Sequence, residues 1–113
     1  MKSDRVTVTL TEEMVVNYEK IFGKQKSLPP SFPMLFYQFI PLPWEYGGAP
    51  IHRKQLCFCQ KKLVIGETYR CEVTLDRKVK RGKNSFYTQS LIGYDYMGEE
   101  CFRCVSELAI RLP

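Results

Sequence analysis

The sequence predicts an α+β domain in which an antiparallel sheet of five strands wraps around one central apolar helix. Three observations predict this class. Residues 6–22 read as a short strand followed by an amphipathic helix, residues 31–40 are almost continuously apolar, and from residue 51 onward the side chains alternate with a period of two. A chain of 113 residues has the length of one compact domain, so we expect 1–113 to fold as a single unit.

The N-terminal part predicts a strand, a helix and a loop. Residues 6–9 alternate valine with threonine, which is typical of a short strand. In the segment 11–22, Thr11 can cap a helix, two glutamates suit its positive end, and Gly23 provides a stop. Residues 24–30 are expected to form a loop.

The segment 31–40 predicts a second helix. Pro33 lies in the first turn, where proline is tolerated, and Pro41 ends the segment. Because nearly all of its side chains are apolar, this helix is expected to be buried on most sides. Residues 41–50 contain three prolines and two adjacent glycines, so they predict an irregular loop.

Four strands are expected after this loop. The alternation begins at residue 51 and continues through 69–76, 85–94 and 101–111, with a glycine in each connecting turn. Short turns between consecutive strands predict an antiparallel meander. A meander curled around an apolar helix is the hot-dog arrangement; a ferredoxin-type sandwich fits less well, because its helices alternate with strand pairs. The turns are expected at 65–67, 80–84 and 96–99.

Four motifs occur in a specific order along the chain. They are Thr9-x-Thr11-Glu-Glu with a helix ending at Phe22-Gly23; Leu28-Pro-Pro-Ser-Phe32; His52-x-x-Gln55-x-x-Phe58 with Leu63-x-x-Gly66-Glu67; and Lys80-Arg-Gly-Lys83 before Tyr96-Met-Gly-Glu99. In order and spacing they resemble the MaoC-like hot-dog domains, in particular the N-terminal half of dehydratases of fatty acid synthase type. The resemblance implies a lyase of fatty acid metabolism, a (3R)-hydroxyacyl-thioester dehydratase or enoyl-CoA hydratase acting without a cofactor on acyl-CoA or acyl carrier protein thioesters.

The sequence departs from this family at its catalytic motif. Active members carry Asp-x-Asn-Pro-x-His after the first helix, but residues 24–27 here are Lys-Gln-Lys-Ser. Acid–base chemistry requires a titratable pair at the substrate. His52, the only histidine, and Glu45 remain as catalytic candidates. We therefore expect a non-catalytic, substrate-holding subunit whose partner supplies the Asp and the His.

The resemblance and the charge also predict how a thioester would be held. The acyl tail is expected beside the central helix, and the net charge of +5 favours an anionic partner. A cluster of basic residues around the turn at 80–84 could receive the phosphates, or could be only a solvated hairpin tip. The residues expected at the substrate are Phe32, Phe36, Phe39 and Trp44 for the acyl tail, and Arg77, Lys78, Lys80, Arg81 and Lys83 for the phosphates.

Several other classes of site and partner are not expected. The five cysteines are an odd number, and the pairs Cys57-x-Cys59 and Cys101-x-x-Cys104 fall within expected strands and not on the tight turns of zinc knuckles. The chain also opens on alternating valine and threonine, so we expect reduced thiols, no metal and a cytoplasmic protein. No apolar run approaches a membrane span. Aromatic residues are not interleaved with the basic ones as nucleic-acid binding requires.

Assembly and function leave alternatives open. A single sheet of this kind has open edges, which predicts a homodimer, or a heterodimer with a catalytic hot-dog chain. An acyl-CoA thioesterase would need a carboxylate near the thioester, for which Glu45 is the only candidate in its loop. A non-enzymatic binding module that uses the basic hairpin is the third possibility.

Overall fold

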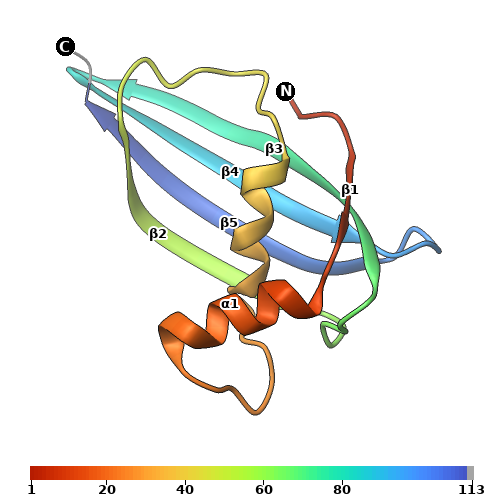
Figure 1. Ribbon diagram of the computed structural model, residues 1–113. Coiled ribbons are helices and arrows are strands. Elements are labelled where there is room, and N and C mark those ends of the chain that lie inside the picture. Colours follow the sequence, from red (N-terminus) through yellow and green to blue (C-terminus); the bar gives the residue numbers. More distant parts are fainter. Residues whose placement is uncertain (112–113) are drawn as a thin grey trace.

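The computed structural model describes residues 1–111, and its strands form one antiparallel sheet (Figure 1). The sheet order is β1-β3-β4-β5-β2, which leaves β1 and β2 at the two edges. This architecture confirms the predicted α+β class. The predicted four-strand meander is wrong at its first strand, because β2 pairs with β5 and not with β3, its neighbour in the sequence. The elements are β1 (Val6–Thr9), α1 (Glu12–Phe22), the 3₁₀-helix η1 (Phe32–Phe39), β2 (Pro50–Cys59), β3 (Thr68–Arg81), β4 (Asn84–Tyr94) and β5 (Glu100–Arg111).

The helix η1 lies across the concave face of the sheet, which we call the inner face (Figure 1). Phe32 and Phe36 are fully buried, and the ring of Phe36 lies 5.7 Å from that of Phe102 on β5. Gly93 on β4 makes room for this packing, because a Cβ at that position would lie 2.1 Å from the Phe102 ring. Aromatic packing of this kind holds η1 at a fixed place on the sheet.

The burial of η1 differs from the expectation. The sequence predicts a helix buried on most sides, but Phe39 is 42% exposed and Leu35 is also exposed. The reason is that η1 is covered by the sheet on one side only, so its other side faces solvent.

The helix α1 begins where the sequence predicts it, with the Thr11 hydroxyl accepting a hydrogen bond from the Met14 N–H at 3.2 Å. Neither helix described in residues 1–111 is long and apolar enough to span a membrane.

Most of the basic residues between Arg77 and Lys83 lie on a strand and not at a hairpin tip. β3 continues to Arg81, and only Gly82 and Lys83 connect it to β4. Gly82 has a φ of 61°, which suits the first position of a two-residue hairpin turn. The expected turn at 80–84 is therefore shorter than predicted, and most of the cations project from a paired strand.

Two β-bulges decide which face each cation occupies. The register of β3 shifts between Leu75 and Arg77, and that of β2 shifts between His52 and Lys54. A bulge inserts one extra residue and so reverses the alternation beyond it. Leu75 faces inward, and after the bulge the inward positions are Lys78 and Lys80. The opposite, outer face receives Arg77, Val79 and Arg81.

Candidate functional site

A buried glutamine organises the polar part of the inner face. Gln89, in the middle of β4, is only 4% exposed. Its Oε1 accepts hydrogen bonds from Trp44 Nε1 at 3.3 Å and from the Tyr46 hydroxyl at 2.7 Å. Its Nε2 donates to the Tyr37 hydroxyl at 3.2 Å. A buried amide is costly unless it is hydrogen-bonded, so this network ties both η1 and the 41–49 loop to the sheet.

A cavity of about 240 Å³ lies beside this network. Its wall combines apolar side chains with the polar groups of Tyr37, Tyr46, Gln89 and His52. Two of its lining residues belong to the edge strand β2, so the cavity lies where the inner face meets that edge. Small-molecule pockets are typically of this composition, although most are larger, at roughly 300–1,000 Å³. The lining residues are Met34, Tyr37, Leu42, Tyr46, Pro50, His52, Gln89 and Leu108.

Two hydroxyl groups are available on this part of the inner face. Burial raises the pKa of Tyr37 well above its usual range and outweighs the lowering by the hydrogen bond from Gln89, so Tyr37 stays protonated at neutral pH. Because Gln89 donates a hydrogen bond to the Tyr37 oxygen, the Tyr37 hydroxyl can itself donate a hydrogen bond to another acceptor. Ser106 Oγ is buried and has no hydrogen-bond partner within residues 1–111. Such an arrangement can donate to a carbonyl oxygen, and it holds no acid–base pair.

The two catalytic candidates from the sequence are not brought together. His52 lies on the inner face of β2, opposite Leu108, and lines the cavity. Glu45 is exposed and is absent from the cavity wall; its carbonyl oxygen accepts a hydrogen bond from the Tyr87 hydroxyl at 3.4 Å. No hydrogen bond or ion pair in the described chain joins His52 to a carboxylate.

The four apolar residues expected at the acyl tail lie in different places. Phe32 and Phe36 form the core between η1 and the sheet. Phe39 instead lines a separate groove of about 390 Å³ against β1 and Met14. Trp44 is the one that touches the polar network, through its hydrogen bond to Gln89.

Four of the five expected cations are divided between the two faces of β3, and the fifth, Lys83, lies in the turn to β4. On the inner face, Lys78 Nζ lies 5.3 Å from the centroid of the Tyr87 ring. That ring in turn packs edge-on against Tyr46, a wall of the cavity, at 5.2 Å. Lys80 lies opposite the buried Ser85 in the register of β3 and β4, so it also lies on the inner face. Arg77 and Arg81 project from the outer face.

The buried thiols are unsuited to nucleophilic catalysis. Burial raises the pKa of Cys71 to about 12 and also raises the pKa of Cys59, Cys101 and Cys104. A thiolate is the reactive form, so these groups remain inert at neutral pH. Within residues 1–111 no three His, Cys, Asp or Glu side chains cluster in a way that could hold a metal ion.

The strand order and the helix on the concave face together define a hot-dog fold. No protein-family model matches the sequence, and no curated protein matches it. Solved structures share its fold. It is similar to a chain of the HadBC (3R)-hydroxyacyl-ACP dehydratase complex from Mycobacterium tuberculosis, with a TM-score of 0.79 and 11% identity over 96% of this chain and 94% of that one.

Two further structures extend this comparison. A chain of the ChsH1-ChsH2 complex from Mycobacterium tuberculosis matches with a TM-score of 0.73 and 10% identity, over 99% of this chain and 89% of that one. The R-hydratase PhaJ1 from Pseudomonas aeruginosa matches with a TM-score of 0.66 and 11% identity, over 100% and 81%. The resemblance to MaoC-like hot-dog domains is thus confirmed at the level of the fold.

Proposed function

We propose that this protein is an acyl-thioester-binding hot-dog subunit that holds the substrate of a (3R)-hydroxyacyl-CoA or acyl carrier protein dehydratase or hydratase. The observation that carries the proposal is the cavity beside η1, which offers the Tyr37 hydroxyl as a donor but, among the described residues, no acid–base pair. The similar structures support it, because they include a dehydratase and a hydratase, and two of them are complexes. The catalytic Asp and His come from a partner chain.

The cavity suits the reacting end of a thioester. The Tyr37 hydroxyl donates to the thioester carbonyl, and Met34, Leu42 and Leu108 contact a short acyl chain. The phosphopantetheine then leaves along the inner face toward Lys78 and Lys80. Arg77 and Arg81 are excluded from this path, because they lie on the other side of the sheet.

The edge strand β2 is the place for the partner. It pairs with β5 on one side only, and it exposes Leu56 and Phe58, which are 48% and 53% accessible. An open edge of ten residues invites pairing with a further strand. A second hot-dog chain, identical or catalytic, that pairs with β2 would lie next to Pro50 and His52 and so would complete the cavity. The five cysteines are free thiols, which supports a reducing, cytoplasmic setting.

A hydration assay tests this function. The chain alone is expected to bind crotonyl-CoA saturably but to leave its double bond intact, as monitored by ultraviolet absorbance. The complex with a hot-dog chain that copurifies from the source cell is expected to hydrate it. Release of free thiol by the chain alone would instead identify a thioesterase, and hydration by the chain alone would overturn the non-catalytic role.

A further inference from the structure

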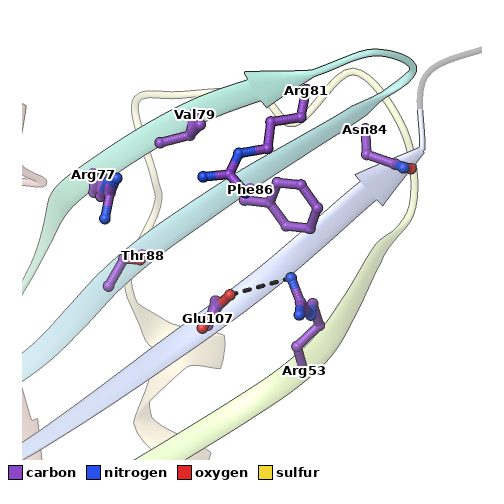
Figure 2. Close-up of a pocket in the computed structure, with 8 residues that line it drawn as sticks. All are labelled: Arg53, Arg77, Val79, Arg81, Asn84, Phe86, Thr88 and Glu107. Atoms are coloured by element: carbon purple, nitrogen blue, oxygen red, sulfur yellow. Dashed lines mark ion pairs between the residues drawn. The ribbon is translucent and has the colours of Figure 1, made fainter.

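The outer face of the sheet carries a second hollow, of about 410 Å³, with three arginines in its wall (Figure 2). Arg77 and Arg81 project from β3, and Arg53 from β2. In the view of Figure 2 the ring of Phe86 lies between the side chains of Arg81 and Arg53. The hollow lies near the hairpin end of β3 and β4, on the opposite side of the sheet from η1.

The two bulges are what place these arginines together. Without the extra residue in β3, Arg77 and Arg81 would continue the inward positions of Leu75. Arg53 occupies the irregular position in β2 itself, between His52 on the inner face and Lys54. Two independent irregularities therefore orient guanidinium groups toward one outer pocket.

One of the three arginines in the pocket wall is ion-paired, and the other two have no ion pair within residues 1–111. Arg53 Nη1 pairs with Glu107 Oε1 at 3.3 Å, and its guanidinium lies 4.9 Å from the centroid of the Phe86 ring. Arg77 and Arg81 take part in no ion pair within residues 1–111. The wall thus carries an excess of positive charge that nothing in the described chain neutralises.

We propose that this outer pocket binds a small organic phosphate. Guanidinium groups donate two parallel hydrogen bonds to phosphoryl oxygens, which distinguishes them from lysine as phosphate ligands. Arg77 and Arg81 bind the phosphoryl group, with the Thr88 hydroxyl and the Asn84 amide as further donors in the wall.

The rest of the wall and the size of the hollow suit such a ligand. Phe86 and Val79 provide an apolar surface for its organic part. The volume lies within the usual range for small-molecule sites, roughly 300–1,000 Å³. The sheet separates this pocket from the inner cavity, so the site is independent of the thioester proposed above.

Calorimetric titration of the purified full chain with ADP, inorganic pyrophosphate and adenosine tests the proposal. ADP and pyrophosphate are expected to bind saturably, and adenosine to bind far more weakly. The double variant R77Q/R81Q should weaken ADP binding by about tenfold or more, since each arginine donates charged hydrogen bonds. The matched variant K24Q/K26Q removes the same charge from exposed lysines outside the pocket wall and should leave the affinity within about twofold.

A second variant separates phosphate recognition from charge alone. R77K/R81K keeps the charge but loses the bidentate geometry, so ADP binding should weaken several-fold while the melting temperature is unchanged. Equal weakening by R77Q/R81Q and K24Q/K26Q would overturn the proposal, as would absence of binding to ADP and pyrophosphate. Preferential binding of a poly-glutamate peptide would also overturn it, in favour of an acidic protein partner.

Discussion

Gln89 shows how one side chain determines the chemistry of the inner face. Its amide accepts hydrogen bonds from Trp44 and Tyr46 and donates one to Tyr37, so it holds two tyrosines of the cavity wall in place. The consequence for Tyr37 is specific. The hydroxyl oxygen is occupied by the amide, while burial keeps the proton in place by raising the pKa. The Tyr37 hydroxyl can therefore donate a hydrogen bond to a carbonyl oxygen.

Replacing Gln89 by leucine should destabilise the protein. Gln89→Leu leaves the Trp44 N–H and two tyrosine hydroxyls without their partner, and an unsatisfied buried donor costs about 1–3 kcal/mol. Chemical denaturation measures the loss. The control is Gln55→Leu. Gln55 is an exposed glutamine on the inner face of β2, and its replacement should change stability by less than about 0.5 kcal/mol. Equal effects of both substitutions would show that the network carries no stability.

This polar network was only partly predictable from the sequence. Tyr37 falls in a stretch of apolar residues, so its hydroxyl is read as core. Gln89 did leave a signal, because it takes an inward position between Tyr87 and Leu91 where the alternation calls for an apolar residue. Which loop reaches that glutamine depends on long-range packing, and no local pattern contains that information. The position of Ser106 on the inner face was not predictable for the same reason.

At the scale of elements, β3 shows the limit of periodicity. The strand and its partner were predictable, because alternation over many residues is a local property of the chain. The bulge after Leu75 was not, since the sequence alternates equally well on either side of it. One extra residue moved Arg77 and Arg81 to the outer face and left Lys78 and Lys80 on the inner one. The basic segment thereby serves two surfaces rather than one hairpin tip.

The turn between β4 and β5 predicts how the protein responds to acid. Asp95 pairs with Lys61 at 2.7 Å and accepts from the backbone N–H groups of Met97 and Glu99. The hydrogen bond from Lys61, followed by those from the backbone, lowers the pKa of Asp95 below its ordinary 3.8. A carboxylate with a lowered folded pKa stabilises the fold above its unfolded pKa. That stabilisation is lost as the pH falls through the folded value.

The free energy of unfolding should therefore decrease below about pH 4. Asp95→Asn should be less stable than the wild type at neutral pH and should show a flatter decrease in acid. Denaturation midpoints measured from neutral pH to about pH 3 follow both curves. Asp4→Asn, at an exposed position outside every described ion pair, serves as the control and should retain the wild-type profile. Parallel profiles for Asp95→Asn and the wild type would contradict this role.

At the scale of the whole molecule, the proposed assembly depends on the free edge of β2. The variant Leu56→Glu/Phe58→Glu places two charges on the free edge, where they would oppose a paired strand. We expect the wild-type chain to exceed the mass of a monomer at micromolar concentration, and this variant to dissociate at least about tenfold more readily. Light scattering coupled to size-exclusion chromatography measures the masses.

A matched variant controls for surface charge. Tyr96→Glu/Met97→Glu places the same charges on exposed apolar residues of the β4–β5 turn, which forms no part of the free edge of β2, and should leave the assembly intact. Dissociation by this turn variant would contradict pairing through β2. So would a wild-type chain that remains a monomer both alone and with a catalytic partner.

The fold as a whole was predictable because its two patterns are strong and separate. The helical spacing ends before residue 41 and the strand alternation begins after residue 50, so the division into helices and strands follows from the sequence. The pairing of β2 with β5 joins strands distant in the chain and was not predictable from local alternation. The cavity was not predictable, because its wall combines η1, the intervening loop and three strands. Its function therefore rests on the geometry, and a direct measurement at the cavity is the decisive one.

Trp44 provides that measurement. It is the only tryptophan, and its indole N–H bonds to Gln89 at the cavity, so it gives a unique signal in a ¹H–¹⁵N correlation spectrum. Crotonyl-pantetheine is the appropriate probe, because it lacks the nucleotide that the outer pocket could bind. We predict a saturable shift of the Trp44 indole signal that is lost or strongly weakened in Tyr37→Phe. An indole signal that stays unmoved up to the solubility limit of the thioester would contradict acyl-thioester binding in this cavity.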